Sequence, residues 1–184
     1  MNIYDDYINY LDECMELLDL LRENNSPLLI VVNDVIKVTD YIYQQYDKKQ
    51  PISEELEEIF TLGFGYLSNV LTELKSYYED CFDKDIKKLN KYAPLIIDII
   101  ILEDFKSFLD VNDYINDETK KEIDDMMSKL DRIVANGKQI SLELQEDVDL
   151  YINDHTPKGE TFTPVYSVYA MIAEELSMTN DIML

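Results

Sequence analysis

The chain has 184 residues, 46% of them hydrophobic, and 39 acidic against 16 basic side chains give it a formal net charge of −23. This length and hydrophobic content suit one folded domain, residues 1–184, and exclude disorder by composition. A charge of this sign repels nucleic acids and anionic membranes at long range. We therefore expect no direct contact with nucleic acid or membrane, and a basic protein surface as the partner.

Nothing in the sequence resembles a secretion signal or a membrane span. The N-terminus lacks a basic region and meets acid at once, at Asp5 and Asp6. The most apolar run, Leu95–Leu102, is interrupted by an aspartate and is far shorter than the roughly 20 residues that a bilayer requires. Cys14 and Cys81 lie in apolar helical patterns, which suits buried, unpaired thiols in a reducing compartment. The sequence therefore predicts a cytoplasmic protein.

Amphipathic repeats predict three helices in the first half of the chain. Apolar residues recur at steps of four and three from Ile3 to about Asn24. Ser26 and Pro27 suit the N-cap and first position of a second helix, which runs to about Tyr46. Ser53 is expected to cap a third helix, whose apolar pattern continues through Cys81 for more than three heptads.

The second half predicts shorter helices. The basic stretch 84–91 either extends the third helix or forms a helix of its own. Further helices are expected at about 94–110, 117–136, 141–153 and 164–178, with Gly137 just past the end of one of them. A polar loop, 154–163, has no assigned role, and the hydrophobic end of the chain, 182–184, is a further candidate docking segment. About seven helices and no strand predict a compact all-α bundle of long amphipathic helices with heptad-like packing.

Catalytic motifs fail one by one. The only histidine, His155, is expected in the polar loop, so di-iron, zinc and nucleophilic sites lack their ligands or their general base. Gly63 and Gly65 are not followed by the Lys and Ser/Thr of a phosphate loop, and glycine within a helix more often permits a close helix approach. We therefore predict that the chain is not an enzyme and holds no metal or cofactor.

Two pairs of carboxylates leave one catalytic alternative open. Glu55 with Glu58, and Glu122 with Asp125, each place two carboxylates on one helical face, where they could hold Mg²⁺ against a phosphate substrate. These pairs resemble the carboxylate motifs of all-helical nucleotide pyrophosphohydrolases, although those motifs stand on successive helices. The resemblance implies a magnesium-dependent nucleotide hydrolase. Solvated helix faces explain the same pairs.

Asp98 is the most unusual single residue, because it shares a helical sector with Leu95, Leu102 and Phe105. It should be at least partly buried. A buried carboxylate needs a hydrogen bond or an opposite charge, so we expect a tyrosine hydroxyl, a lysine or the start of another helix beside it. The functional alternative is a perturbed acid that lines a pocket.

The acid is densest on the first and third expected helices, with a net charge of about −6 over residues 1–25 and −7 over 51–83. The candidate partner-binding residues come from these two helices together with one tyrosine of the second: Asp5, Asp12, Glu16, Asp19, Glu54, Glu57, Glu58 and Tyr41. In size and charge the chain resembles toxin-neutralising immunity proteins and mobile-element inhibitors of host defence. We therefore expect a non-catalytic inhibitor that occupies a basic surface of a nucleic-acid-handling partner. A purely structural or oligomeric helical bundle stays open, as does the oligomeric state.

Overall fold

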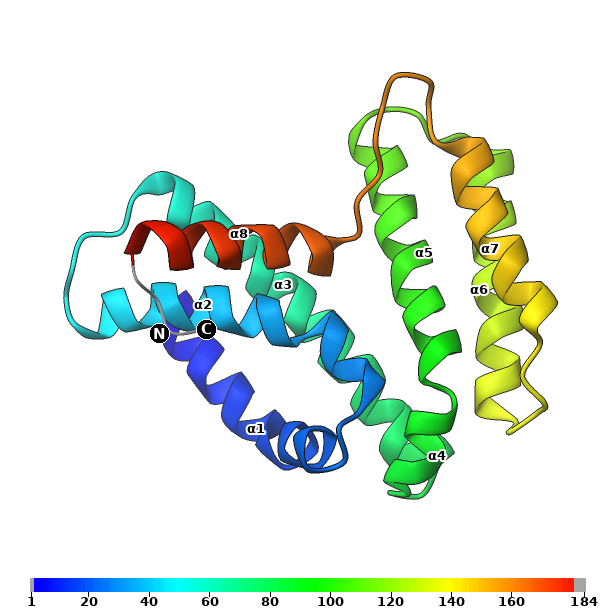
Figure 1. Cartoon of the computed structure of the whole chain (residues 1–184), viewed down its shortest axis with the longest axis horizontal. Coiled ribbons are helices and arrows are strands. Elements are labelled where there is room, and N and C mark those ends of the chain that lie inside the picture. Colours follow the sequence, from blue (N-terminus) through cyan, green and yellow to red (C-terminus); the bar gives the residue numbers. More distant parts are fainter. Residues whose placement is uncertain (1, 181–184) are drawn as a thin grey trace. The chain divides into compact units, whose positions relative to one another are not determined.

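The computed structural model describes residues 2–180, and the side chains of residues 2–177 (Figure 1). The described residues form eight α-helices, one 3₁₀ helix and one π-helix, with no strand among them. The expected all-α class with packed helices is confirmed. The hydrophobic segment 182–184 lies outside the described residues.

The chain divides into two compact units. Unit 1 is Met1–Ser76 with Val165–Leu184, and unit 2 is Tyr77–Pro164, so unit 2 is inserted into the sequence of unit 1. The single domain over residues 1–184 stays a prediction.

Unit 1 contains α1 (Ile3–Glu23), η1 (Pro27–Val31), α2 (Asn33–Asp47), α3 (Glu54–Ser76) and α8 (Val165–Asn180). α8 packs against α2 although the two helices are far apart in sequence (Figure 1). The α1 repeat is confirmed, and so is the α3 repeat through Leu74. Burial of such apolar side chains contributes most of the folding energy, at about 1.5–3 kcal/mol each. The core of unit 1 includes Tyr7, Leu11, Leu18, Leu21, Leu28, Val35, Ile42, Phe60, Leu67, Leu71 and Leu74.

The predicted second helix is wrong in one respect, because it is broken at Val32. Ser26 does cap it, with its Oγ accepting a hydrogen bond from the backbone N of Leu28 at 3.2 Å. However, η1 is a 3₁₀ helix, and α2 starts only at Asn33. The β-branched run at 30–32 disfavours a continuous α-helix, and the Asn-Asp pair that follows favours a new helix start.

Gly63 allows α2, α3 and α8 to approach closely. A Cβ atom at this position would lie 2.8 Å from Thr39 Cγ2 and 2.9 Å from Tyr169 Cε2. The hydroxyl of Tyr169 donates a hydrogen bond to the backbone O of Ile59 at 2.6 Å, which fixes its ring over the glycine. The expected role of Gly63 in close helix packing is confirmed.

Unit 2 contains η2 (Tyr77–Cys81), α4 (Ile86–Lys91), α5 (Ala93–Val111), α6 (Asp117–Ala135) and α7 (Leu142–His155). The basic stretch forms its own helix, α4, and α5 packs against both α6 and α7. Gly137 has a φ of +60°, as expected for a residue just past a helix end. No helix among the described residues is long and apolar enough to cross a membrane. The core includes Leu89, Leu95, Ile96, Leu102, Phe105, Ile123, Leu130, Val134 and Val148.

The predicted continuation of the third helix to Cys81 is wrong. α3 ends at Ser76, and η2 is a π-helix in which the backbone N of Phe82 donates to the O of Tyr77 at 2.9 Å. A π-turn adds one residue and rotates the following side chains. Phe82 is therefore buried and Cys81 is exposed, against our expectation, whereas Cys14 is buried as expected.

Candidate protein-binding surface

Tyrosine rings from α1 and α2 meet at one end of these helices in unit 1. The rings of Tyr4 and Tyr46 stack with their centroids 4.4 Å apart, and the ring of Tyr43 lies 6.1 Å from that of Tyr46. The side-chain Nδ2 of Asn2 donates a hydrogen bond to the Tyr46 hydroxyl at 2.7 Å. These tyrosine rings are half-buried, so part of each faces solvent.

Carboxylates from three helices surround these rings. Burial, followed by the charges of Asp47, Asp5 and other neighbouring acids, raises the pKa of the Tyr43 hydroxyl. Burial and the charge of Glu57, in that order, raise the pKa of Tyr4. The carboxylates are the smaller cause of both shifts, and they place negative charge near these hydroxyls. We call this region the acidic–tyrosine surface, and its residues are Tyr4, Asp5, Asp12, Tyr43, Tyr46, Asp47 and Glu57.

A buried network beneath the surface fixes α1 on α2. The hydroxyl of the fully buried Tyr7 donates to Asp40 Oδ1 at 2.7 Å and lies 2.8 Å from Thr39 Oγ1. Burial raises the pKa of Asp40, although the hydrogen bond from Tyr7 and the charge of Arg22 act in the opposite direction. Because Tyr7 belongs to α1 and its partners belong to α2, the network sets the relative position of the helices that carry the surface.

A hollow of about 370 Å³ lies along the start of α3. The hydroxyl of Ser53 caps this helix by accepting a hydrogen bond from the backbone N of Leu56 at 3.2 Å. Acidic side chains line this hollow together with an apolar one, Leu62, which is 63% exposed. We call this region the glutamate hollow, and its residues are Glu54, Glu57, Glu58, Thr61 and Leu62. Glu57 belongs to both regions and joins them.

The structure brings together some of the predicted partner-binding residues. Asp5, Asp12 and Glu57 belong to the acidic–tyrosine surface, and Glu54 and Glu58 line the glutamate hollow. Helical periodicity puts two further residues on the same exposed stripe of α1 as Asp12. These are Glu16 and Asp19, the second of which pairs with Arg22 at 3.7 Å.

Tyr41 does not join this group. It is half-buried, and its hydroxyl accepts a hydrogen bond from Gln45 Nε2 at 2.8 Å within the same helix. Tyr43, Tyr46 and Asp47 occupy the surface instead, and sequence reasoning missed them. Their spacing of three and four residues was a usable signal, because it places them on one face of α2.

Asp98 is half-buried, as predicted. The expected partner, a tyrosine hydroxyl, a lysine or the start of another helix, does not bond to its buried oxygen within residues 2–177. The Oδ2 atom of Asp98 is buried and has no hydrogen-bond partner among the described residues. Burial, followed by the charge of Asp149 on α7, raises the pKa of Asp98 to about 7. The surroundings of this carboxyl group in unit 2 therefore favour its protonated form.

The carboxylate pairs of the magnesium alternative lie in different units, Glu55 with Glu58 in unit 1 and Glu122 with Asp125 in unit 2. Within residues 2–180, no group of three or more histidine, cysteine, aspartate or glutamate side chains is placed to hold a metal ion. The expected place of His155 in the polar loop is wrong, because this residue is the last one of α7. Its ring stacks on that of Tyr151 with centroids 3.8 Å apart.

Comparisons with protein-family models, curated proteins and solved structures find no match for this chain.

Proposed function

We propose that the chain is a non-catalytic acidic protein-binding domain that uses unit 1 to occupy a basic surface of a partner protein. The observation that carries this proposal is the convergence of carboxylates from α1, α2 and α3 on a group of half-exposed tyrosine rings. Carboxylates attract lysine and arginine, and tyrosine rings add contact area and can stack against cations. The exposed Leu62 in the glutamate hollow supplies an apolar contact next to this charge.

We infer that the partner is a nucleic-acid-handling protein, such as a toxin or a host-defence protein, and that the chain inhibits it in the manner of an immunity protein. The basic surface of such a partner normally meets phosphate groups. A domain with a net charge of −23 carries the same sign of charge as nucleic acid and is attracted to the same surface. Binding would then exclude the nucleic acid.

Two charge-matched variants test which surface binds. The first neutralises the acidic–tyrosine surface with Asp5→Asn, Asp12→Asn, Asp47→Asn and Glu57→Gln. The control neutralises four exposed carboxylates of unit 2 with Asp110→Asn, Asp113→Asn, Asp125→Asn and Glu146→Gln. Each variant removes four of the 23 excess negative charges, so any difference between them reports position and not net charge.

Tagged forms of the wild-type chain and both variants are used to capture partners from the cells that encode the chain. We expect the wild type and the control to retain the same basic protein, and the surface variant to bind it about tenfold or more weakly, a loss of about 1.4 kcal/mol or more. Capture should weaken as NaCl rises from about 0.1 M to about 0.5 M, because salt screens exposed charges.

The captured protein is then tested for nucleic-acid binding with and without the wild-type chain. Loss of nucleic-acid binding on addition of the chain is expected. Equal capture by the two variants, or a partner that keeps its nucleic acid while bound to the chain, would contradict the proposal.

A further inference from the structure

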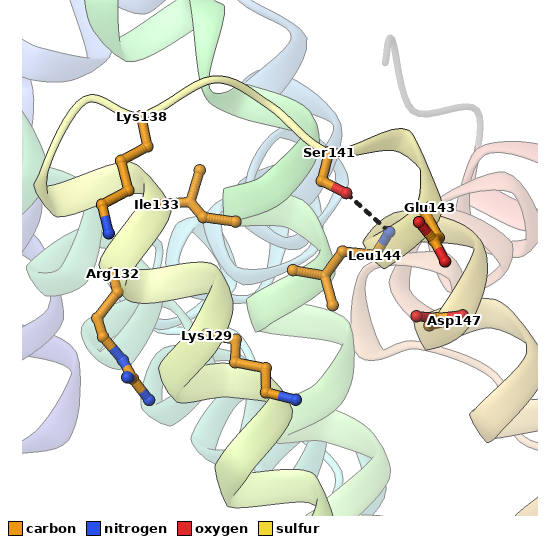
Figure 2. Close-up of a pocket in the computed structure, with 8 residues that line it drawn as sticks. All are labelled: Lys129, Arg132, Ile133, Lys138, Ser141, Glu143, Leu144 and Asp147. Carbon is orange, nitrogen blue, oxygen red and sulfur yellow. Dashed lines mark hydrogen bonds between the residues drawn. The ribbon is translucent and has the colours of Figure 1, made fainter.

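A shallow surface cavity of about 400 Å³, largely open to solvent, lies on unit 2 between the end of α6 and the start of α7. Figure 2 shows Lys129, Arg132 and Lys138 on its α6 side, and Glu143 and Asp147 on its α7 side, with the apolar side chains of Ile133 and Leu144 between them. Cavities of this size accept small molecules. The two sides of the cavity therefore carry opposite charges across an apolar floor.

The three cations of this cavity lack a carboxylate partner within the described residues, although Arg132 Nε donates a hydrogen bond to the backbone O of Ser128 at 3.3 Å. None of them forms an ion pair within the part of the chain that the structure describes, although Glu143 and Asp147 line the same cavity. Acidic side chains outnumber basic ones by 39 to 16 in the whole chain, so three neighbouring cations without an ion pair stand out. The helix dipole favours Lys129 and Arg132 in the last turns of α6, but it does not account for Lys138, which lies beyond the helix.

Hydrogen bonds hold the backbone on both sides of the cavity. The backbone N of Lys138 donates to the O of Ile133 at 3.0 Å, and the O of Lys138 accepts from the Tyr92 hydroxyl at 2.8 Å. On the other side, Ser141 Oγ accepts a hydrogen bond from the backbone N of Leu144 at 3.2 Å, shown as the dashed line in Figure 2. A preformed site loses less conformational entropy on binding than a mobile one.

We propose that this cavity binds a small dipolar molecule with an anionic group at one end and a protonated amine at the other. The anionic group lies against Lys129, Arg132 and Lys138, and the amine against Glu143 and Asp147. An anion alone meets these two carboxylates and the field of a chain with a net charge of −23, whereas a cation alone meets three positive side chains. A molecule that carries both charges reduces each of these penalties and pairs with both sides.

The anionic group has two possible sources, a phosphate or a carboxylate, and both pair with lysine and arginine. O-phosphoethanolamine and 5-aminovalerate each combine one of these anions with an amine. Their half-molecules, inorganic phosphate with ethylamine and valerate with pentylamine, are the matched controls. Comparison of the two dipolar probes shows which anion the site prefers.

The full-length chain, labelled with ¹⁵N, is titrated with each probe and followed by two-dimensional NMR. We expect amide shifts confined to residues 129–147, and at least one dipolar probe that binds about tenfold or more tightly than either of its half-molecules. Lys138→Gln and Glu143→Gln should each lower the affinity for that probe by a similar factor, because each removes a charge that pairs with one end of the probe. Lys120→Gln changes an exposed lysine of α6 outside the cavity and should leave the affinity unchanged.

Three outcomes would overturn the proposal. The first is the absence of shifts with both dipolar probes up to about 10 mM, which corresponds to a binding energy weaker than about 3 kcal/mol. The second is a half-molecule that binds as tightly as the dipolar probe. The third is a loss of affinity in Lys120→Gln equal to that in Lys138→Gln, which would indicate general charge attraction. None of these results bears on the protein-binding surface of unit 1.

Discussion

Asp98 combines a half-buried carboxyl group, an orphaned oxygen and a neighbouring acid on α7. Burial removes water from the ionised form, and the charge of Asp149 opposes ionisation further, so the folded chain favours the protonated acid. The pKa of about 7 in the folded state compares with about 3.9 for an unfolded chain. Ionisation of this group therefore opposes folding.

The upward shift in the pKa of Asp98 predicts how the stability of the chain depends on pH. The contribution of Asp98 to the free energy of unfolding is most favourable below about pH 4 and is lost as pH rises through about 7. Asp98→Asn should remove this dependence and, because part of the group is screened by solvent, stabilise the chain by about 1–2 kcal/mol at pH 8. Urea unfolding followed by circular dichroism at about pH 4 and pH 8 measures the effect.

The control for this prediction is Asp110→Asn, which changes an exposed acid on the same helix. It should leave the difference in stability between the two pH values as in the wild type. A variant at Asp98 that loses stability at pH 8 would show that the ionised carboxylate has a stabilising partner after all.

At the scale of elements, the crossing of α2, α3 and α8 at Gly63 leaves no room for a side chain. Gly63→Ala places a methyl group 2.8 Å from Thr39 Cγ2 and 2.9 Å from Tyr169 Cε2. We expect this overpacking to lower the free energy of unfolding by about 1–3 kcal/mol. Thermal or urea unfolding gives the value directly.

Gly65 provides the matched control two residues further along α3. An added Cβ at this position meets no atom within 4 Å, and alanine favours a helix over glycine. Gly65→Ala should therefore stabilise the chain by up to about 1 kcal/mol. If both substitutions stabilised the chain, the close approach of the three helices would be wrong.

The elements also show what the sequence could predict. The start of α1, the caps at Ser26 and Ser53 and the turn at Gly137 were predicted, because each depends on residues within a few positions. The 3₁₀ helix η1 and the π-helix η2 were not predicted. They differ from an α-helix by a shift of one residue in the hydrogen-bond pattern, and packing in the folded chain decides that shift.

The same distinction applies to the candidate surface. The density of acid pointed to Asp5, Asp12 and Glu57 on two separate helices. Tyr43 and Asp47 share a face of α2, but only the packing of α2 against α1 brings that face beside Asp5. Periodicity along one helix does not determine which neighbour covers it, so these residues were missed.

At the scale of the whole molecule, 39 acidic side chains repel one another in the folded chain more strongly than in the expanded one. Raising NaCl from about 20 mM to about 500 mM shortens the Debye length from about 20 Å to about 4 Å. We expect the melting temperature to rise by several degrees over this range. Thermal unfolding followed by circular dichroism measures the rise.

The two variants that each lack four carboxylates provide the control for this experiment. Their weaker self-repulsion should give a smaller rise with salt than the wild type shows. A melting temperature that is constant or falls as salt increases would mean that attractive ion pairs, and not repulsion, dominate the charge balance of the folded chain.

The insertion of unit 2 into the sequence of unit 1 has a consequence for synthesis on the ribosome. α8 contributes Tyr169, which covers Gly63 and hydrogen-bonds to Ile59, a residue 110 positions earlier. Translation proceeds at about 5–20 residues per second, so α1, α2 and α3 emerge several seconds before α8 can cover them. During that interval the nascent chain exposes apolar surface at this crossing, and such surface favours aggregation until α8 covers it.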